Sequence, residues 1–223
     1  MKNKSLSHHL TRRGAFTLIE MLVVIGIIGV LAALILGGAS IANSKMKRAK
    51  AEAERDALVT AIQSYKNKKG FYPPDNTKST IMSPLFYELT GTVALGGNYK
   101  SPVSGEILSP ANITNIFNAG GFLNASADPS EVLNFAPTIA KSTRTASFVI
   151  PSTTTTYTLF CITIKGPPQI NTIDGKPFEP YDVWNYVSTN PTNNPGSYDL
   201  WIDVLYSGHT NRISNWSKDP EAL

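Results

Sequence analysis

The chain has 223 residues, a formal net charge of +4 and one cysteine. This length suits one domain together with an anchor, and a single cysteine, Cys161, excludes an intramolecular disulfide. The first 15 residues carry Lys2, Lys4, Arg12 and Arg13 and no acid, so the rest of the chain has 16 basic and 16 acidic residues. The excess positive charge therefore belongs to the N-terminus, and it gives no support for a nucleic-acid-binding surface on a folded domain.

An apolar run follows this basic start. No charged residue occurs from Met21 to Ser44, and a helix of about 20 apolar residues is enough to cross a bilayer. One carboxylate, Glu20, stands at the edge of the run, where an isolated acid is costly and calls for a functional reason. We expect residues 1–15 to form a leader peptide and residues 16–44 a transmembrane or fibre-core helix.

The junction between the leader and the apolar run reads Gly14-Ala15, followed by Phe16-Thr17-Leu18-Ile19-Glu20. It resembles the processing site of type IV prepilins and of type II secretion pseudopilins. The resemblance implies that a prepilin peptidase cuts between Ala15 and Phe16 and that the new amino group of Phe16 is methylated. A cut after Gly14 is the alternative, because the family usually has glycine just before the cut. The first reading makes Glu20 the fifth residue of the mature chain.

The resemblance also implies that Glu20 meets the amino terminus of a neighbouring subunit and sets the register of assembly. The simpler reading is that Glu20 only caps its own helix, near the positive end of the helix dipole. Two other readings of the whole segment stay open. One is a secretory signal cleaved after Gly37-Gly38-Ala39, which would start the mature chain at Ser40, and the other is a plain signal anchor.

Residues 45–70 are predicted to continue as an amphipathic helix of the head, which spans 45–223. Apolar residues recur there at helical spacing: Met46, Ala49, Ala53, Ala57, Leu58, Ala61, Ile62 and Tyr65. Gly70 is expected to end the helix in a left-handed conformation. The following Phe71-Tyr72-Pro73-Pro74 is similar to the turn that ends this helix in pseudopilins.

The rest of the head is predicted to be an antiparallel sheet preceded by a variable region. Residues 71–145 are rich in turn residues and indicate loops, with one short helix at Ser83–Leu89 that has Pro84 in its first turn. In 146–223 we expect strands at Ala146–Ile150, Tyr157–Lys165, Tyr181–Val187 and Tyr198–Tyr206. Apolar residues on both faces of the second strand favour a central position, with Cys161 in the core. The predicted fold is α+β and pilin-like, with a long N-terminal helix packed on one small antiparallel sheet of three or four strands.

The C-terminal part bears on a metal site. Tyr181-Asp182-Val183-Trp184-Asn185-Tyr186 and the later Tyr198-Asp199-Leu200 resemble elements of the major pseudopilin of type II secretion, a family that binds one calcium in the following loop. Here that loop, Ser207 to Arg212, has no acid. Asp199 and Asp203 are weak calcium candidates, because two carboxylates do not fill six to eight oxygen positions. We therefore expect no metal and no other cofactor.

These patterns together predict a structural protein and no enzyme, since no phosphate loop, dinucleotide fingerprint or zinc-ligand pair is present in the sequence. The resemblance implies a type II secretion pseudopilin in the bacterial inner membrane, single-pass, with its head in the periplasm. The expected partners are prepilin peptidase, other pilin or pseudopilin subunits, the inner-membrane assembly platform and membrane lipid, with no nucleic acid. The alternatives are a type IV pilin for adhesion, motility or DNA uptake, and a secreted or anchored binding module.

Overall fold

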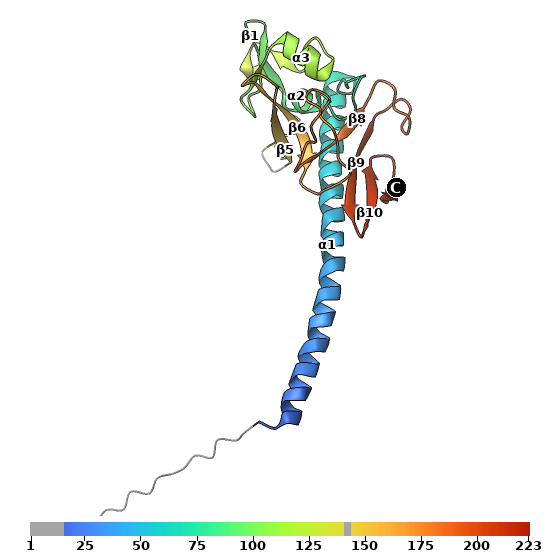
Figure 1. Ribbon diagram of the computed structural model, residues 1–223. Helices are drawn as coiled ribbons and strands as arrows, with labels where there is room; N and C mark the ends of the chain where they lie inside the picture. Colours follow the sequence, from blue (N-terminus) through green and yellow to red (C-terminus); the bar gives the residue numbers. More distant parts are fainter. Residues whose placement is uncertain (1–15, 141–143) are drawn as a thin grey trace, which may run out of the picture. The chain divides into compact units, whose positions relative to one another are not determined.

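The computed structural model describes residues 16–140 and 144–223, and at 36–38 the backbone alone. The predicted α+β class is confirmed, because a long N-terminal helix is followed by small, largely antiparallel sheets (Figure 1). The chain divides into two compact units, the first ending at Asn43 and the second spanning Ser44–Leu223. The predicted leader peptide, residues 1–15 with Gly14 and Ala15, lies outside the described residues.

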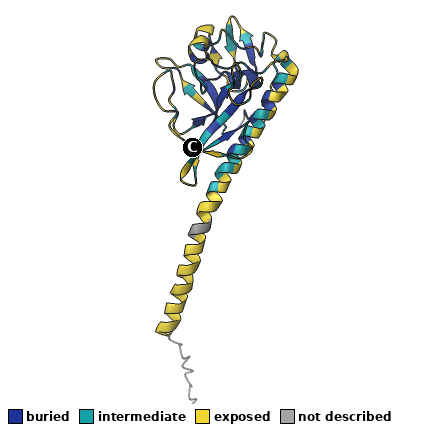
Figure 2. Cartoon of the chain, turned by 90° about the vertical axis from the view of Figure 1, so that its right-hand side faces the viewer, coloured by how far each residue is buried: buried dark blue, intermediate teal, exposed yellow. Residues whose placement is uncertain are grey.

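Helix α1 (Leu18–Lys69) contributes to both units. In the first unit, the described side chains up to Ile35 are all exposed (Figure 2). The helix ends as predicted: Gly70 has a φ of +88°, and its N–H donates to the Lys66 carbonyl at 2.8 Å. Only glycine adopts this backbone conformation without strain, so the residue type fixes where the helix stops.

The buried face of α1 in the second unit differs from the predicted stripe. Leu58, Ala61, Ile62 and Tyr65 are buried as expected. Nearer the N-terminus, Met46, Ala49 and Ala53 are exposed, and the residues that face the core are Ala51 and Glu54. Alanine carries little periodic signal because it is tolerated on either face of a helix, so the alanines there gave the wrong register for the first turns of this segment.

Residues 71–145 hold more regular structure than the loops and single helix predicted. The short helix is present as α2 (Leu85–Thr90), directly after Pro84. Four strands form a sheet in the order β3-β2-β1-β4, in which β1 and β4 are parallel. The other elements of the region are β1 (Thr92–Leu95), β2 (Asn98–Lys100), β3 (Ile107–Leu108), α3 (Pro110–Phe117), β4 (Ala125–Ser126) and the 3-10 turn η1 (Pro129–Glu131). Strands of two to four residues are too short to show an alternating pattern, which explains why the sequence did not reveal them.

The next sheet has the order β5-β6-β7, formed by β5 (Thr145–Val149), β6 (Thr156–Ile162) and β7 (Asp182–Val183). The central position predicted for the second strand is confirmed, since β6 lies between the other two and all but its first residue are buried. Cys161 is fully buried, as expected of a core thiol. The strand ends at Ile162 and does not continue to Lys165.

The last sheet has the order β11-β10-β9-β8, from β8 (Asn185–Val187), β9 (Asp199–Tyr206), β10 (His209–Ser214) and β11 (Glu221–Ala222). Two predictions are corrected here. The strand expected at 181–187 is interrupted at Trp184, and its halves, β7 and β8, belong to different sheets. The segment expected as a loop, Ser207 to Arg212, is a tight turn followed by β10. In its described residues, the head therefore contains three small sheets instead of one.

A buried carboxylate ties the end of α1 to the rest of the second unit. Glu88 of α2 accepts the Tyr65 hydroxyl at 2.8 Å, the Leu123 N–H at 2.8 Å and the Asn124 N–H at 3.0 Å. Desolvation raises the pKa of Glu88, and these three donors oppose that shift by stabilising the ionised form. The contacts join α1, α2 and the segment before β4 at one point in the core.

Candidate processing and assembly segment

The first turn of α1 is built around Thr17 and Glu20. The Thr17 N–H and the Thr17 hydroxyl both donate to Glu20 Oε2 at 2.8 Å, and the Glu20 N–H donates to Thr17 Oγ1 at 3.3 Å. This reciprocal arrangement is a capping box, in which each side chain satisfies a backbone N–H that the helix itself leaves free. In the single chain, Glu20 therefore caps its own helix.

The capping box adds a residue to the predicted site. Thr17 was not predicted as a site residue, although the Thr-x-x-Glu spacing from Thr17 to Glu20 is typical of a capping box. Phe16 lies just before the helix and is 77 % exposed. The roles predicted for Gly14, Ala15, Phe16 and Glu20 in processing and in contacts between subunits stay predictions.

The rest of the first unit presents an apolar surface with no cover from the described chain. Every large apolar side chain from Phe16 to Ile35 is exposed. An added Cβ at Gly26 or Gly29 would meet no atom within 4 Å, so these glycines make no close contact within the chain. α1 contains a window of mean hydropathy 2.9, long and apolar enough to cross a membrane, and none of that window is buried. Such a surface costs free energy in water and is stabilised in lipid or against other apolar helices.

The two weak calcium candidates are held by protein donors. Asp199 is 3 % exposed and accepts the backbone N–H groups of Thr192, Asn193 and Asn194, each at 2.9 Å. Asp203 makes a two-pronged ion pair with Arg212, both contacts at 2.8 Å. The two carboxylates therefore hold separate protein donors, and within the described residues no group of three or more His, Cys, Asp or Glu is placed to hold a metal ion.

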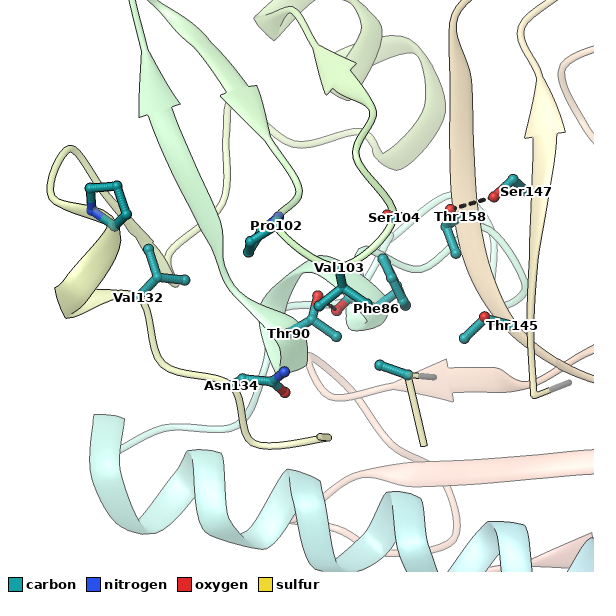
Figure 3. A pocket seen from close by; sticks show the side chains of 12 residues that line it. Phe86, Thr90, Pro102, Val103, Ser104, Val132, Asn134, Thr145, Ser147 and Thr158 are labelled. Atoms are coloured by element: carbon teal, nitrogen blue, oxygen red, sulfur yellow. Dashed lines mark hydrogen bonds between the residues drawn. The ribbon is translucent and has the colours of Figure 1, made fainter. Parts of the chain in front are cut away.

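A cavity of the second unit measures about 730 Å³ and is lined mainly by small hydroxyl-bearing and apolar side chains (Figure 3). Its described lining contains no charged side chain. Four of these hydroxyls are bonded within the protein: those of Thr158 and Ser147 to each other at 2.8 Å, that of Thr90 to the Phe86 carbonyl at 2.8 Å, and that of Ser104 to Ser101 at 2.8 Å. These four hydroxyls therefore serve as internal hydrogen-bonding groups of the cavity wall.

Comparison with known proteins gives a match for the N-terminal segment. Residues 10–36 match the family model described as the prokaryotic N-terminal methylation motif. No curated protein and no solved structure matches the chain. The matched residues include the capping box and most of the exposed apolar surface, and together with the candidate membrane span they support anchoring in a membrane. The chain therefore carries a prokaryotic N-terminal methylation motif on a long apolar helix, which supports a type IV pilin-like family.

Proposed function

We propose that this chain is a structural subunit of a type II secretion pseudopilus, without enzymatic activity. Prepilin peptidase would remove residues 1–15 and methylate Phe16, and the mature subunit would remain in the inner membrane with its head in the periplasm. The assembly platform would then stack subunits through their N-terminal helices into a fibre. The observation that carries this proposal is the uncovered apolar surface from Phe16 to Ile35, which lies within the residues that match the methylation motif, 10–36.

The physical role proposed for Glu20 goes beyond capping. After cleavage, the new amino group of Phe16 is a cation at the start of an apolar helix. When helices pack in a fibre, this cation and the Glu20 carboxylate would both leave water, which costs several kcal/mol for an unpaired charge. Pairing Glu20 with the amino terminus of a neighbouring subunit compensates both charges. The two groups meet only when the two helices have one particular axial offset.

The capping box allows the two roles of Glu20 to be separated by matched variants. Glu20→Gln keeps an oxygen that can accept from Thr17 but removes the charge. Thr17→Val removes the hydroxyl of the cap but keeps the carboxylate. Glu20→Ala removes both functions.

If Glu20 pairs between subunits, Glu20→Gln and Glu20→Ala are cleaved and remain in the membrane but form no fibre, whereas Thr17→Val assembles. Oligomers cross-linked within the cell envelope and quantified by immunoblot give the readout of fibre assembly. A wild-type fibre yield from Glu20→Gln, or a loss of fibres in Thr17→Val equal to that in Glu20→Ala, would leave capping as the only role.

A type IV pilin is the second candidate within the same family. Deletion of the gene distinguishes the two systems: a pseudopilin defect leaves secreted proteins in the periplasm, whereas a pilin defect removes surface fibres and leaves secretion intact. N-terminal sequencing of the membrane fraction tests the remaining alternative. A chain that starts at Ser40 would identify a secreted module with a cleaved signal.

A further inference from the structure

A second cavity, of about 300 Å³, lies in the second unit, between the segment after β6 and the segment before β7. Its walls include Pro168, Pro177, Pro180, Phe178 and Tyr181. Backbone and side-chain hydrogen bonds fix these walls. Gln169 donates to the Val183 carbonyl at 2.8 Å and accepts the Val183 N–H at 2.5 Å, and the Phe178 N–H donates to the Gln169 carbonyl at 3.1 Å. The cavity is therefore already formed in the single chain.

A buried carboxylate, Asp182, lines this cavity. Asp182 is 6 % exposed, and its Oδ2 accepts the N–H of Gly166. Within the part of the chain that the structure describes, no other hydrogen bond and no ion pair reaches this carboxylate. A carboxylate has about four acceptor positions, so Asp182 is only partly satisfied.

The charges around Asp182 do not neutralise it. Lys165 also lines the cavity; it is exposed and favours the ionised form, but no ion pair between it and Asp182 is present among the described contacts. Glu179, another lining residue, and Asp203 oppose the ionised form. Asp203 is itself paired with Arg212. Desolvation dominates and raises the pKa of Asp182 to about 6, so the group is mostly ionised at neutral pH and lacks a close cation.

We propose that this cavity binds a lysine side chain of a second copy of this chain, with the ammonium at Asp182 and the alkyl stem along the proline and aromatic walls. Lysine suits such a site because its stem packs on apolar surface while its charge seeks a polar group. The chain supplies the ligand, since Lys45, Lys47 and Lys68 form no ion pair within the described residues. This inference rests on the proposed function.

Effective concentration is the reason for choosing a second copy as the occupant. A single side chain in a partly open cavity binds weakly, because its contact area is small and the ordering of the chain opposes binding. A repeating assembly presents the same lysine to the same cavity at every subunit, and the effective concentration then reaches the millimolar range. The site would thus add to the contacts of the N-terminal helices and link the heads along the fibre.

A zero-length cross-linking experiment tests the proposal. Cell envelopes that contain the assembled fibre are treated with a carbodiimide, which joins a carboxylate to an amine in contact with loss of water. Covalent dimers are cut from a denaturing gel and digested, and mass spectrometry identifies the joined residues. Links within one chain, such as Asp182 to Lys165, stay at the monomer mass and do not enter this band.

We expect a dimer peptide that joins Asp182 to a lysine of this chain. Asp182→Asn keeps an oxygen for the Gly166 N–H but offers no carboxylate to the carbodiimide, so the Asp182–lysine peptide should disappear and the dimer yield should fall. Asp174→Asn, a change at an exposed aspartate outside the cavity, is the matched control and should leave the yield unchanged.

Fibres whose dimers contain no link to Asp182, or an Asp182 link only to a different protein, would overturn the second-copy site and leave the proposed function standing. Failure of the wild-type chain to form fibres would instead overturn the proposed function and this inference with it.

Discussion

The carboxylate of Glu54 in α1 lies 3.7 Å from Nε of Arg144, the residue directly before β5. This is within ion-pair distance but too long for a hydrogen bond, and neither oxygen of Glu54 has a hydrogen-bond partner among the residues that the structure describes. Glu54 as a residue is 1 % exposed, and desolvation raises its pKa to about 7, with Lys50 and Arg144 opposing the shift. Glu54 is therefore an incompletely compensated charge in the core of the second unit.

The pH dependence of stability follows from this raised pKa. Folding favours the protonated form of Glu54, so its contribution is most favourable below the unfolded pKa of 4.5 and declines as pH rises to about 7. Glu54→Gln should raise the free energy of unfolding at pH 8 by on the order of 1–3 kcal/mol and give no gain at pH 4. Thermal melts of the full chain in detergent at both pH values measure this. Glu52→Gln, at a half-buried acid paired with Arg48, is the control, and equal destabilisation by Glu54→Gln at both pH values would contradict the prediction.

Close packing around Gly166 leaves no room for a side chain at this position. An added Cβ would come within 2.0 Å of the Asp203 carbonyl oxygen, a backbone atom that cannot move aside easily. Gly166→Ala should therefore lower the free energy of unfolding by about 3 kcal/mol. At Gly120 an added Cβ meets nothing within 4 Å, so Gly120→Ala should change stability by less than about 0.5 kcal/mol. Denaturant melts of the two variants provide the comparison, and equal midpoints would show that β9 yields to the methyl group.

Chelator is expected to leave the melting temperature unchanged, because the protein's own donors already hold the Asp199 and Asp203 carboxylates. A site filled at 100 times its dissociation constant would add about 2.7 kcal/mol. Melts with and without EDTA detect a shift of that size, and a clear decrease with EDTA would restore the calcium site. Asp199→Ala serves as the positive control, since it leaves the N–H groups of the 192–194 loop without their acceptor and should cost about 2 kcal/mol.

The predicted cleavage after Ala15 can be tested with substitutions on the leader side of the cut. The small residue before the cut must fit the peptidase, so Ala15→Leu should leave the full-length chain in the membrane fraction. Gly14→Ala is the matched variant, and it should be trimmed normally if the cut follows Ala15. Mass spectrometry reads the mass of both products. Normal trimming of Ala15→Leu with a block in Gly14→Ala would move the cut to the bond after Gly14.

The sequence alone determined those features that depend on neighbouring residues. The processing motif, the apolar run and the end of α1 at Gly70 can each be recognised from consecutive residues. Membrane insertion and helix termination depend on the residue types within such a short segment. β6 was recognised for the same reason, since seven residues are enough to show apolar side chains on both faces.

Tertiary structure decided which polar residues are buried and what they meet. Nothing local shows that Glu54 turns into the core beside Arg144, 90 positions away in the sequence, or that Asp182 lines a cavity closed by Gln169. The division of the head into three sheets was likewise hidden, because Trp184 separates two strands whose partners, β6 and β9, lie far apart in the chain. Burial and strand pairing are set by the free energy of long-range contacts. A local sequence pattern does not show which distant residue forms the contact.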